Sequence, residues 1–223
     1  MMKPINYLID SFMIPFLNFS YENIFPNYGI AIILLTVLIK IVFYPLTKKQ
    51  FEAMKANQKI QPMMKKIQEK YKGQPEKLHK EMTKLWKENN ANPLSGCLPA
   101  LVQLPVFIAV FYTVNSDKFK SMLLVEGVNP GLFPFWLKDL GLPDTTYILP
   151  VIIGVSTYLS QKVMMTDPKQ ARMMAILPVV MFAFSMKMPA GVLLYWATQQ
   201  VLSMFQQMAI MKPNTLSKKE MTT

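Results

Sequence analysis

A run of strongly apolar residues at positions 29–47, interrupted by one full charge at Lys40, constrains this chain more than any other feature. About 20 residues of α-helix, each rising ~1.5 Å, cross the ~30 Å hydrocarbon core of a bilayer. The run therefore predicts a transmembrane helix. A lysine within such a helix costs roughly 2.5 kcal/mol or more, and it is kept mainly where it faces protein or water. Lys40 is thus the first candidate functional residue, unless its long side chain simply reaches the membrane interface.

The composition agrees with a membrane protein. Hydrophobic residues make up 52% of the 223 residues and occur in long blocks. A formal charge of +11 would suggest nucleic-acid binding in a soluble protein, but beside membrane spans it is better explained by cytoplasmic loops. The chain has one cysteine, Cys97, and one histidine, His79. This excludes an internal disulfide and argues against a catalytic zinc site, so we expect neither a metal nor a cofactor.

These patterns predict an all-α, polytopic membrane protein. Residues 1–28 space their apolar side chains as one face of a helix, which is typical of an external amphipathic segment lying in the membrane interface. Residues 48–92 hold twelve lysines against five acidic residues and break at Gly73, which predicts a cytoplasmic helical hairpin. Residues 212–223 form a basic tail. The core, 29–211, contains five predicted spans, at about 29–47, 94–114, 146–165, 173–188 and 192–210.

The loop charges predict the topology, because lysine-rich loops stay in the cytoplasm. The hairpin carries a net charge of +7, whereas segments 1–28 and 115–145 each carry −1. The amino terminus and the loop 115–145 are therefore expected outside, and the hairpin and tail inside. The basic face of the hairpin suits anionic lipid headgroups or non-specific phosphate contacts, the alternative being a solvated coiled-coil arm.

Several motifs, in this order, resemble the YidC/Oxa/Alb family of membrane protein insertases. They extend over about residues 28–211, which makes the resemblance specific. The motifs are Thr36-Val37-Leu38-Ile39-Lys40, Tyr44-Pro45-Leu46-Thr47, Lys59-Ile60-Gln61-Pro62, Asn92-Pro93-Leu94-Ser95-Gly96-Cys97-Leu98-Pro99, Gln103-Leu104-Pro105-Val106-Phe107, Tyr147-Ile148-Leu149-Pro150, Leu177-Pro178 and Pro189-Ala190-Gly191-Val192-Leu193-Leu194-Tyr195-Trp196.

The resemblance implies a protein that inserts nascent membrane proteins and helps them fold, alone or with the Sec translocon, through a hydrophilic intramembrane groove. The family commonly has an arginine where this chain has Lys40, and lysine keeps the charge without the bidentate fork. The groove residues that the resemblance implies are Lys40, Thr36, Gln103, Gln161, Tyr195 and Trp196.

The implied location is the bacterial inner membrane. The implied partners are nascent membrane proteins, the ribosome, membrane lipids, the Sec translocon and the signal recognition particle pathway. We expect a monomer and no specific nucleic acid.

Other interpretations remain open from the residues alone. Thr36 and other hydroxyl side chains in the spans can bond their own helix backbones or join helices. A small transporter or channel would also need Lys40, but it gives no reason for the hairpin 48–92. An intramembrane enzyme is the weaker alternative, because every carboxylate lies outside the predicted spans and no Ser/His, paired-Asp or metal-ligand set appears within them.

Overall fold

The computed structural model describes residues 3–89, 91–92, 98–133, 136–164 and 176–210, and α-helices dominate this part of the chain. The predicted all-α class is confirmed. The five predicted spans overlap helices α3, α6, α8, α10 and α11, and the first of them also includes the start of α4. The predicted tail 212–223 lies outside the described residues, as do residues 165–175, which include the connection between the third and fourth predicted spans.

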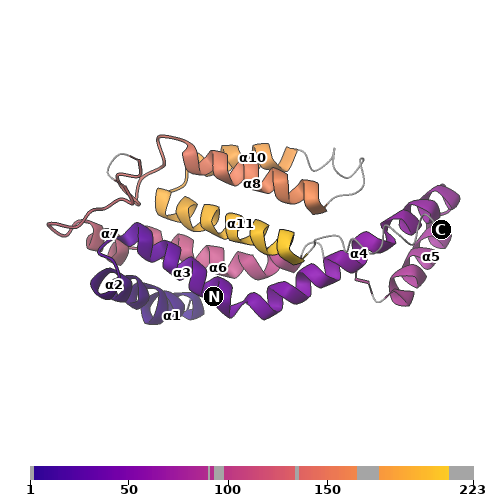
Figure 1. Cartoon of the computed structure of the whole chain (residues 1–223), viewed down its shortest axis with the longest axis horizontal. Coiled ribbons are helices and arrows are strands. Elements are labelled where there is room, and N and C mark those ends of the chain that lie inside the picture. Colours follow the sequence, from indigo (N-terminus) through magenta and orange to yellow (C-terminus); the bar gives the residue numbers. More distant parts are fainter. Residues whose placement is uncertain (1–2, 90, 93–97, 134–135, 165–175, 211–223) are drawn as a thin grey trace.

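Helix α11 (Ala190–Ile210) lies at the centre of the bundle (Figure 1). It packs most extensively against α8 (Ile148–Met164) and α3 (Tyr28–Val42), and also against α6 (Leu98–Asn115). Helix α10 (Ile176–Ser185) packs against α8. The first turns of α11 are apolar on every side, which is typical of a fully buried helix. Their buried residues are Ala190, Gly191, Val192, Leu193, Leu194 and Tyr195.

The amino-terminal segment is helical but interrupted. Helix α1 (Lys3–Leu8), the π-helical turn η1 (Ile9–Met13) and α2 (Ile14–Asn23) follow one another directly. The interruption precedes Pro15, which fits the first turn of α2 but has no N–H to continue the preceding helix. The apolar face packs onto α3 and α6, and Met13 is only 1% exposed.

Helix α3 ends at Val42 rather than at Thr47, where the first predicted span ends. Helix α4 (Tyr44–Lys70) begins after a change of direction of 65°. Pro45 lies in its first turn, where it starts a helix easily but cannot extend the previous one. By length and composition, none of the described helices qualifies alone as a membrane span, and α3 with α4 qualifies only as this bent pair.

A helical hairpin projects from one end of the bundle (Figure 1). Helix α4 continues into it and packs against α5 (Pro75–Glu88). Gly73 in the connecting turn has a φ of +86°, a conformation that glycine adopts without strain. Met82 and Leu85 are the buried residues of α5.

The connection between α6 and α8 lies at the opposite end of the bundle and includes a short helix, α7 (Asp117–Leu123), that the sequence analysis did not predict. The hydroxyl of Ser116 caps α7 by accepting a hydrogen bond from the backbone N–H of Phe119 at 3.1 Å.

The remainder of this connection is tied to the bundle by backbone contacts. The Asn27 side chain donates to the Leu132 carbonyl at 3.0 Å while capping α3, and the Gly191 N–H donates to the Leu140 carbonyl at 2.8 Å. Gly29 makes the approach possible, since a Cβ there would lie 2.7 Å from Leu132 Cδ1. This loop therefore rests on the starts of both α3 and α11.

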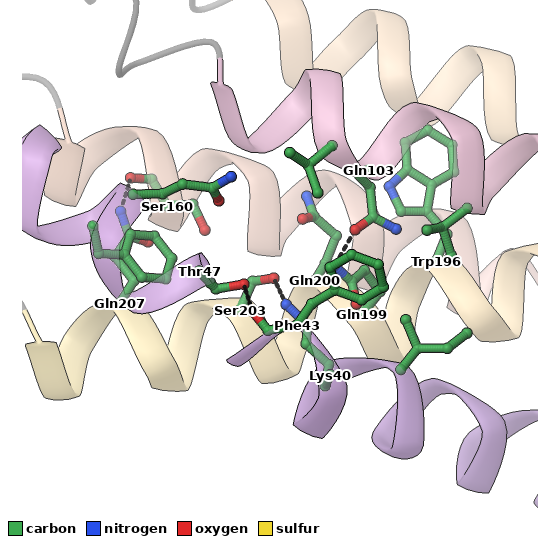
Figure 2. Close-up of a pocket in the computed structure, with 15 residues that line it drawn as sticks. Lys40, Phe43, Thr47, Gln103, Ser160, Trp196, Gln199, Gln200, Ser203 and Gln207 are labelled. Carbon is green, nitrogen blue, oxygen red and sulfur yellow. Dashed lines mark hydrogen bonds between the residues drawn. The ribbon is translucent and has the colours of Figure 1, made fainter. Parts of the chain in front are cut away.

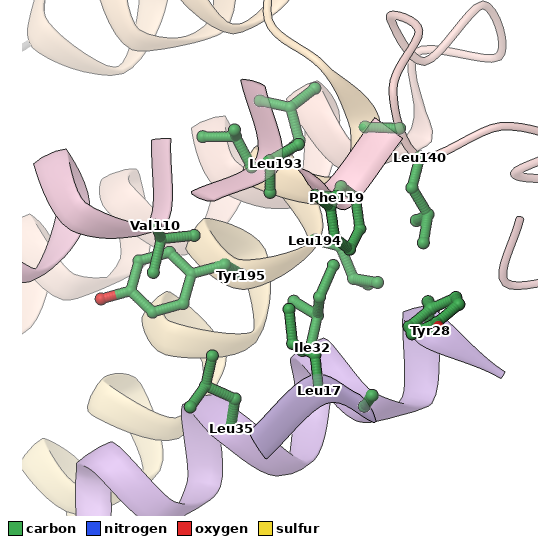
Figure 3. Close-up of a cluster of buried hydrophobic side chains, with 14 of the residues drawn as sticks. Leu17, Tyr28, Ile32, Leu35, Val110, Phe119, Leu140, Leu193, Leu194 and Tyr195 are labelled. Carbon is green, nitrogen blue, oxygen red and sulfur yellow. The ribbon is translucent and has the colours of Figure 1, made fainter. Parts of the chain in front are cut away.

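The hydrophobic core fills this same half of the bundle (Figure 3). Side chains from α2, α3, α6, α7 and α11 meet there, and Tyr195 and Phe119 are both 0% exposed. The labelled members of the cluster are Leu17, Tyr28, Ile32, Leu35, Val110, Phe119, Leu140, Leu193, Leu194 and Tyr195.

Candidate functional site: a polar cavity within the helix bundle

A cavity of about 310 Å³ lies where α3, α4, α6, α8 and α11 meet (Figure 2). Its wall includes apolar side chains such as those of Phe43 and Trp196, together with many polar ones. Burying so many uncharged polar groups among apolar helices is costly unless they bond one another, water or a ligand. Five of the polar residues on the wall are glutamines, namely Gln50, Gln103, Gln199, Gln200 and Gln207.

Lys40 supplies the positive charge of the cavity. The residue is 7% exposed, and its Nζ donates to Ser203 Oγ at 2.6 Å and to Gln206 Oε1 at 3.4 Å. No carboxylate lies within 4.0 Å of Nζ in the described part of the chain. The ammonium group therefore has only neutral protein partners there, and its charge is available to an anionic group that enters the cavity.

A hydrogen-bonded chain joins α6 to α11 at one end of the cavity. Gln199 Nε2 donates to Gln103 Oε1 at 2.6 Å, and Gln103 Nε2 donates to the hydroxyl of Tyr195. Tyr195 and Gln199 lie four residues apart, one above the other on the same face of α11. Because Tyr195 is fully buried, it fixes Gln103 from behind rather than lining the cavity.

A polar stripe on α11 forms much of the wall. Gln199, Gln200, Ser203 and Gln207 follow helical spacing, so they lie on neighbouring positions of one face. Two of them also join α8, because Gln200 Nε2 donates to Thr157 Oγ1 at 3.0 Å and Gln207 Nε2 donates to the Ser160 carbonyl at 3.4 Å. With Trp196 at the other end, the stripe follows α11 for about 16 Å at 1.5 Å per residue.

The structure brings together some of the six predicted groove residues and separates others. Lys40, Gln103 and Trp196 line the cavity. Thr36 does not, since its hydroxyl is buried and donates to the Ile32 carbonyl of its own helix at 2.7 Å. Gln161 does not line it either, and its Nε2 is buried without a partner.

Most of the polar residues on the cavity wall were not predicted from the sequence. Gln199, Gln200 and Gln207 had a detectable signal, the helical spacing of amides within the last predicted span. Gln50 and Thr47 were assigned to the hairpin and to the end of the first span, and only the bend at Phe43 brings them to the cavity.

A second cavity of about 230 Å³ adjoins the first between α3 and α11. Its wall is almost entirely apolar, with Ile41 and Phe205 65% and 58% exposed. Lys40 borders both cavities. In the described residues, no three His, Cys, Asp or Glu side chains gather where they could hold a metal ion.

Comparison with known proteins agrees with the resemblance seen in the motifs. A family model described as "60Kd inner membrane protein" matches residues 19–219. The membrane protein insertase YidC of Helicobacter pylori strain J99 is 41% identical over 200 residues, which is 88% of this chain and 35% of that protein. The YidC of Geobacter sulfurreducens is 40% identical over 189 residues, which is 84% of this chain and 34% of that protein.

The chain therefore spans about a third of the length of these curated relatives. A crystal structure described as an active YidC insertase with its first transmembrane domain resolved has a TM-score of 0.72 and 26% identity, and the match covers 92% of this chain and 46% of that one. With a family model that matches most of its length and relatives of this identity, the chain belongs to the YidC/Oxa/Alb family of membrane protein insertases.

Proposed function

We propose that this chain inserts segments of nascent membrane proteins into a bilayer and that the polar cavity is the groove that receives them. The observation that carries the proposal is the buried Lys40 ammonium, which lines this cavity with only neutral protein partners in the described residues. Such a charge inside an apolar bundle is costly, and it is typically retained where it serves a substrate.

The membrane arrangement follows from the surface of the bundle. Large apolar side chains are exposed on several helices, and a surface of this kind suits lipid better than water. Helices α3, α6, α8, α10 and α11 serve as the five spans, with α7 and its loop outside and the α4–α5 hairpin in the cytoplasm. Examples of exposed residues are Leu101, Val151, Ile176, Val179 and Phe205, which are 64%, 49%, 66%, 64% and 58% exposed.

In the proposed mechanism, the polar cavity shortens the distance that polar groups travel through hydrocarbon. A polar or acidic tail that follows an apolar segment faces a large cost in crossing hydrocarbon. The cavity offers it a cation at Lys40 and amide partners along α11. The apolar segment then moves sideways into lipid, driven by burial of apolar surface at roughly 25 cal/mol per Å².

The hairpin supplies the contact with the machinery of synthesis in this proposal. Its lysines attract the phosphates of a ribosome or of lipid headgroups, and this attraction weakens with salt. Cooperation with the Sec translocon and the signal recognition particle pathway extends the same role to larger substrates.

Insertion into proteoliposomes tests the proposal. A one-span substrate with a short acidic outer tail is added to vesicles that contain the wild type, Lys40→Ala or Lys40→Glu, and the protected tail is measured by protease digestion. Lys120→Ala on α7 removes an equal charge from an exposed position and serves as the control. We expect Lys40→Glu to abolish insertion while the control matches the wild type. Normal insertion by both Lys40 variants would show that the charge plays no part.

A further inference from the structure

Two amide groups on the cavity wall each have one atom without a hydrogen-bond partner. Gln50 and Gln199 are 3% and 8% exposed, and both line the cavity. The Nε2 of Gln50 and the Oε1 of Gln199 are buried without a protein partner in the structure. A buried polar atom without a partner is unfavourable, so both atoms favour a polar group that enters the cavity.

The two free atoms have opposite hydrogen-bonding characters. Gln50 Nε2 can only donate, whereas Gln199 Oε1 can only accept. A carboxylate satisfies the donor and the Lys40 ammonium, but it has no proton for Gln199. An ammonium group satisfies the acceptor but is repelled by Lys40. A neutral carboxamide carries both an N–H donor and a carbonyl acceptor, so it can bond with either glutamine.

The cavity already contains one bond of this kind. The amide of Gln199 donates to the amide of Gln103 at 2.6 Å, and this bond leaves the Gln199 oxygen free. Figure 2 shows this pair on the wall of the cavity that Lys40 and Trp196 also line. A carboxamide that enters here meets an amide and an apolar ring, while a carboxylate is drawn to the lysine.

We infer that the cavity has a second mode of recognition, in which it binds the neutral carboxamide side chains, asparagine and glutamine, of tails that are carried across the membrane. This inference rests on the proposed function and names a further class of substrate for the same site. A carboxamide that enters the cavity would displace any water bound at Gln50 Nε2 and Gln199 Oε1. Acidic tails depend chiefly on Lys40, and amide tails depend chiefly on the two glutamines.

A series of three substrates tests this inference. One position in the outer tail is Asn, Asp or Leu, which are close in size but differ in hydrogen bonding and charge. The wild type is compared with Gln199→Leu, Gln50→Leu and Lys40→Met in proteoliposomes. Gln68→Leu, which changes an exposed glutamine of α4, is the matched control.

We expect Gln199→Leu to lower insertion of the Asn tail about fivefold, the factor for one lost hydrogen bond, and to lower insertion of the Asp and Leu tails less. Lys40→Met should lower insertion of the Asp tail alone. Because Gln199 also bonds Gln103, Gln50→Leu provides a second test, since the structure gives its free nitrogen no partner to lose. It should lower insertion of the Asn tail more than insertion of the Leu tail.

Three results would overturn the inference. If both glutamine variants lowered insertion of all three tails equally, these residues would only stabilise the bundle. If both variants inserted the Asn tail as well as the wild type, the two glutamines would not bind a carboxamide. These two results leave the proposed function intact, whereas a wild type that inserts none of the three substrates would overturn both.

Discussion

Replacing Lys40 with methionine should reduce insertion without reducing stability. A lysine at the centre of a membrane helix costs about 2.5–3.5 kcal/mol, which is an upper bound for Lys40 because it lies in the last turn of α3. Its bond to Ser203 at 2.6 Å is well formed and offsets about 1.5–3 kcal/mol, while that to Gln206 at 3.4 Å adds little. Methionine has a similar length and no charge. Lys40→Met should therefore leave the free energy of unfolding unchanged or raise it by up to about 2 kcal/mol.

The opposite change is expected at the partner of the lysine. Ser203→Ala keeps the buried charge but removes its best acceptor, which should lower the free energy of unfolding by about 1–3 kcal/mol. Comparing the two variants thus separates the free-energy cost of burying the charge from the stabilisation that its hydrogen bond to Ser203 contributes.

Both quantities can be measured on the same preparations. Thermal or denaturant unfolding of each variant in lipid nanodiscs gives the stability, and protease protection of an acidic tail in proteoliposomes gives insertion. A loss of more than about 2 kcal/mol in Lys40→Met would refute the reasoning, because the lysine would then join α3 to α11 as a structural element. If Lys40→Met were as stable as the wild type and inserted the acidic tail fully, Lys40 would have no role in binding the substrate.

Three further predictions concern the scaffold, each measured as the free energy of unfolding in detergent. Gly29→Ala should lower the free energy of unfolding by about 1–3 kcal/mol, because its Cβ would lie 2.7 Å from a leucine side chain. Gly154→Ala, whose Cβ would have its nearest atom at 3.7 Å, should raise the free energy of unfolding by up to about 1 kcal/mol. Equal effects of the two substitutions would contradict this packing. Asp144→Ala should lower the free energy of unfolding by about 2 kcal/mol, since this 3%-exposed carboxylate accepts hydrogen bonds from the backbone N–H groups of Thr146 and Leu149, both at 2.9 Å. An unchanged free energy of unfolding would mean that water replaces the carboxylate. Tyr195→Phe should cost about 1 kcal/mol through the lost bond from the α6 glutamine, and no change would show that the glutamine finds another acceptor.

Much of the fold was predictable because apolar blocks separated by charged segments dictate helices in a membrane protein. The bend after Val42 was not predicted, since apolar residues continue past it and only Pro45 marks the place. Helix α7 was missed because its seven residues are too few for a clear periodicity, although Ser116 followed by Asp117 is a recognisable start.

Among the polar residues of the cavity wall, those predicted are the ones that stand alone in an apolar run. Lys40 and Gln103 satisfy that condition and line the cavity. Thr36 satisfies it equally, yet its hydroxyl bonds its own helix, an outcome that sequence spacing cannot distinguish. Gln50 needed knowledge of the bend, and the Gln199 face needed knowledge that α11 is central. Convergence of distant segments, rather than composition, makes these residues neighbours.

The central place of α11 has a consequence for the order in which the protein can be completed. The bond between Lys40 and Ser203 joins residues 163 positions apart, and the bond between Gln103 and Gln199 joins residues 96 apart. During synthesis, α3, α6 and α8 emerge before the helix against which all three pack. Until α11 arrives, the Lys40 ammonium and the Gln103 amide have none of these partners. The newly made protein therefore passes through a stage in which it exposes polar groups to lipid, and it needs at that stage the kind of help that it is proposed to give to others.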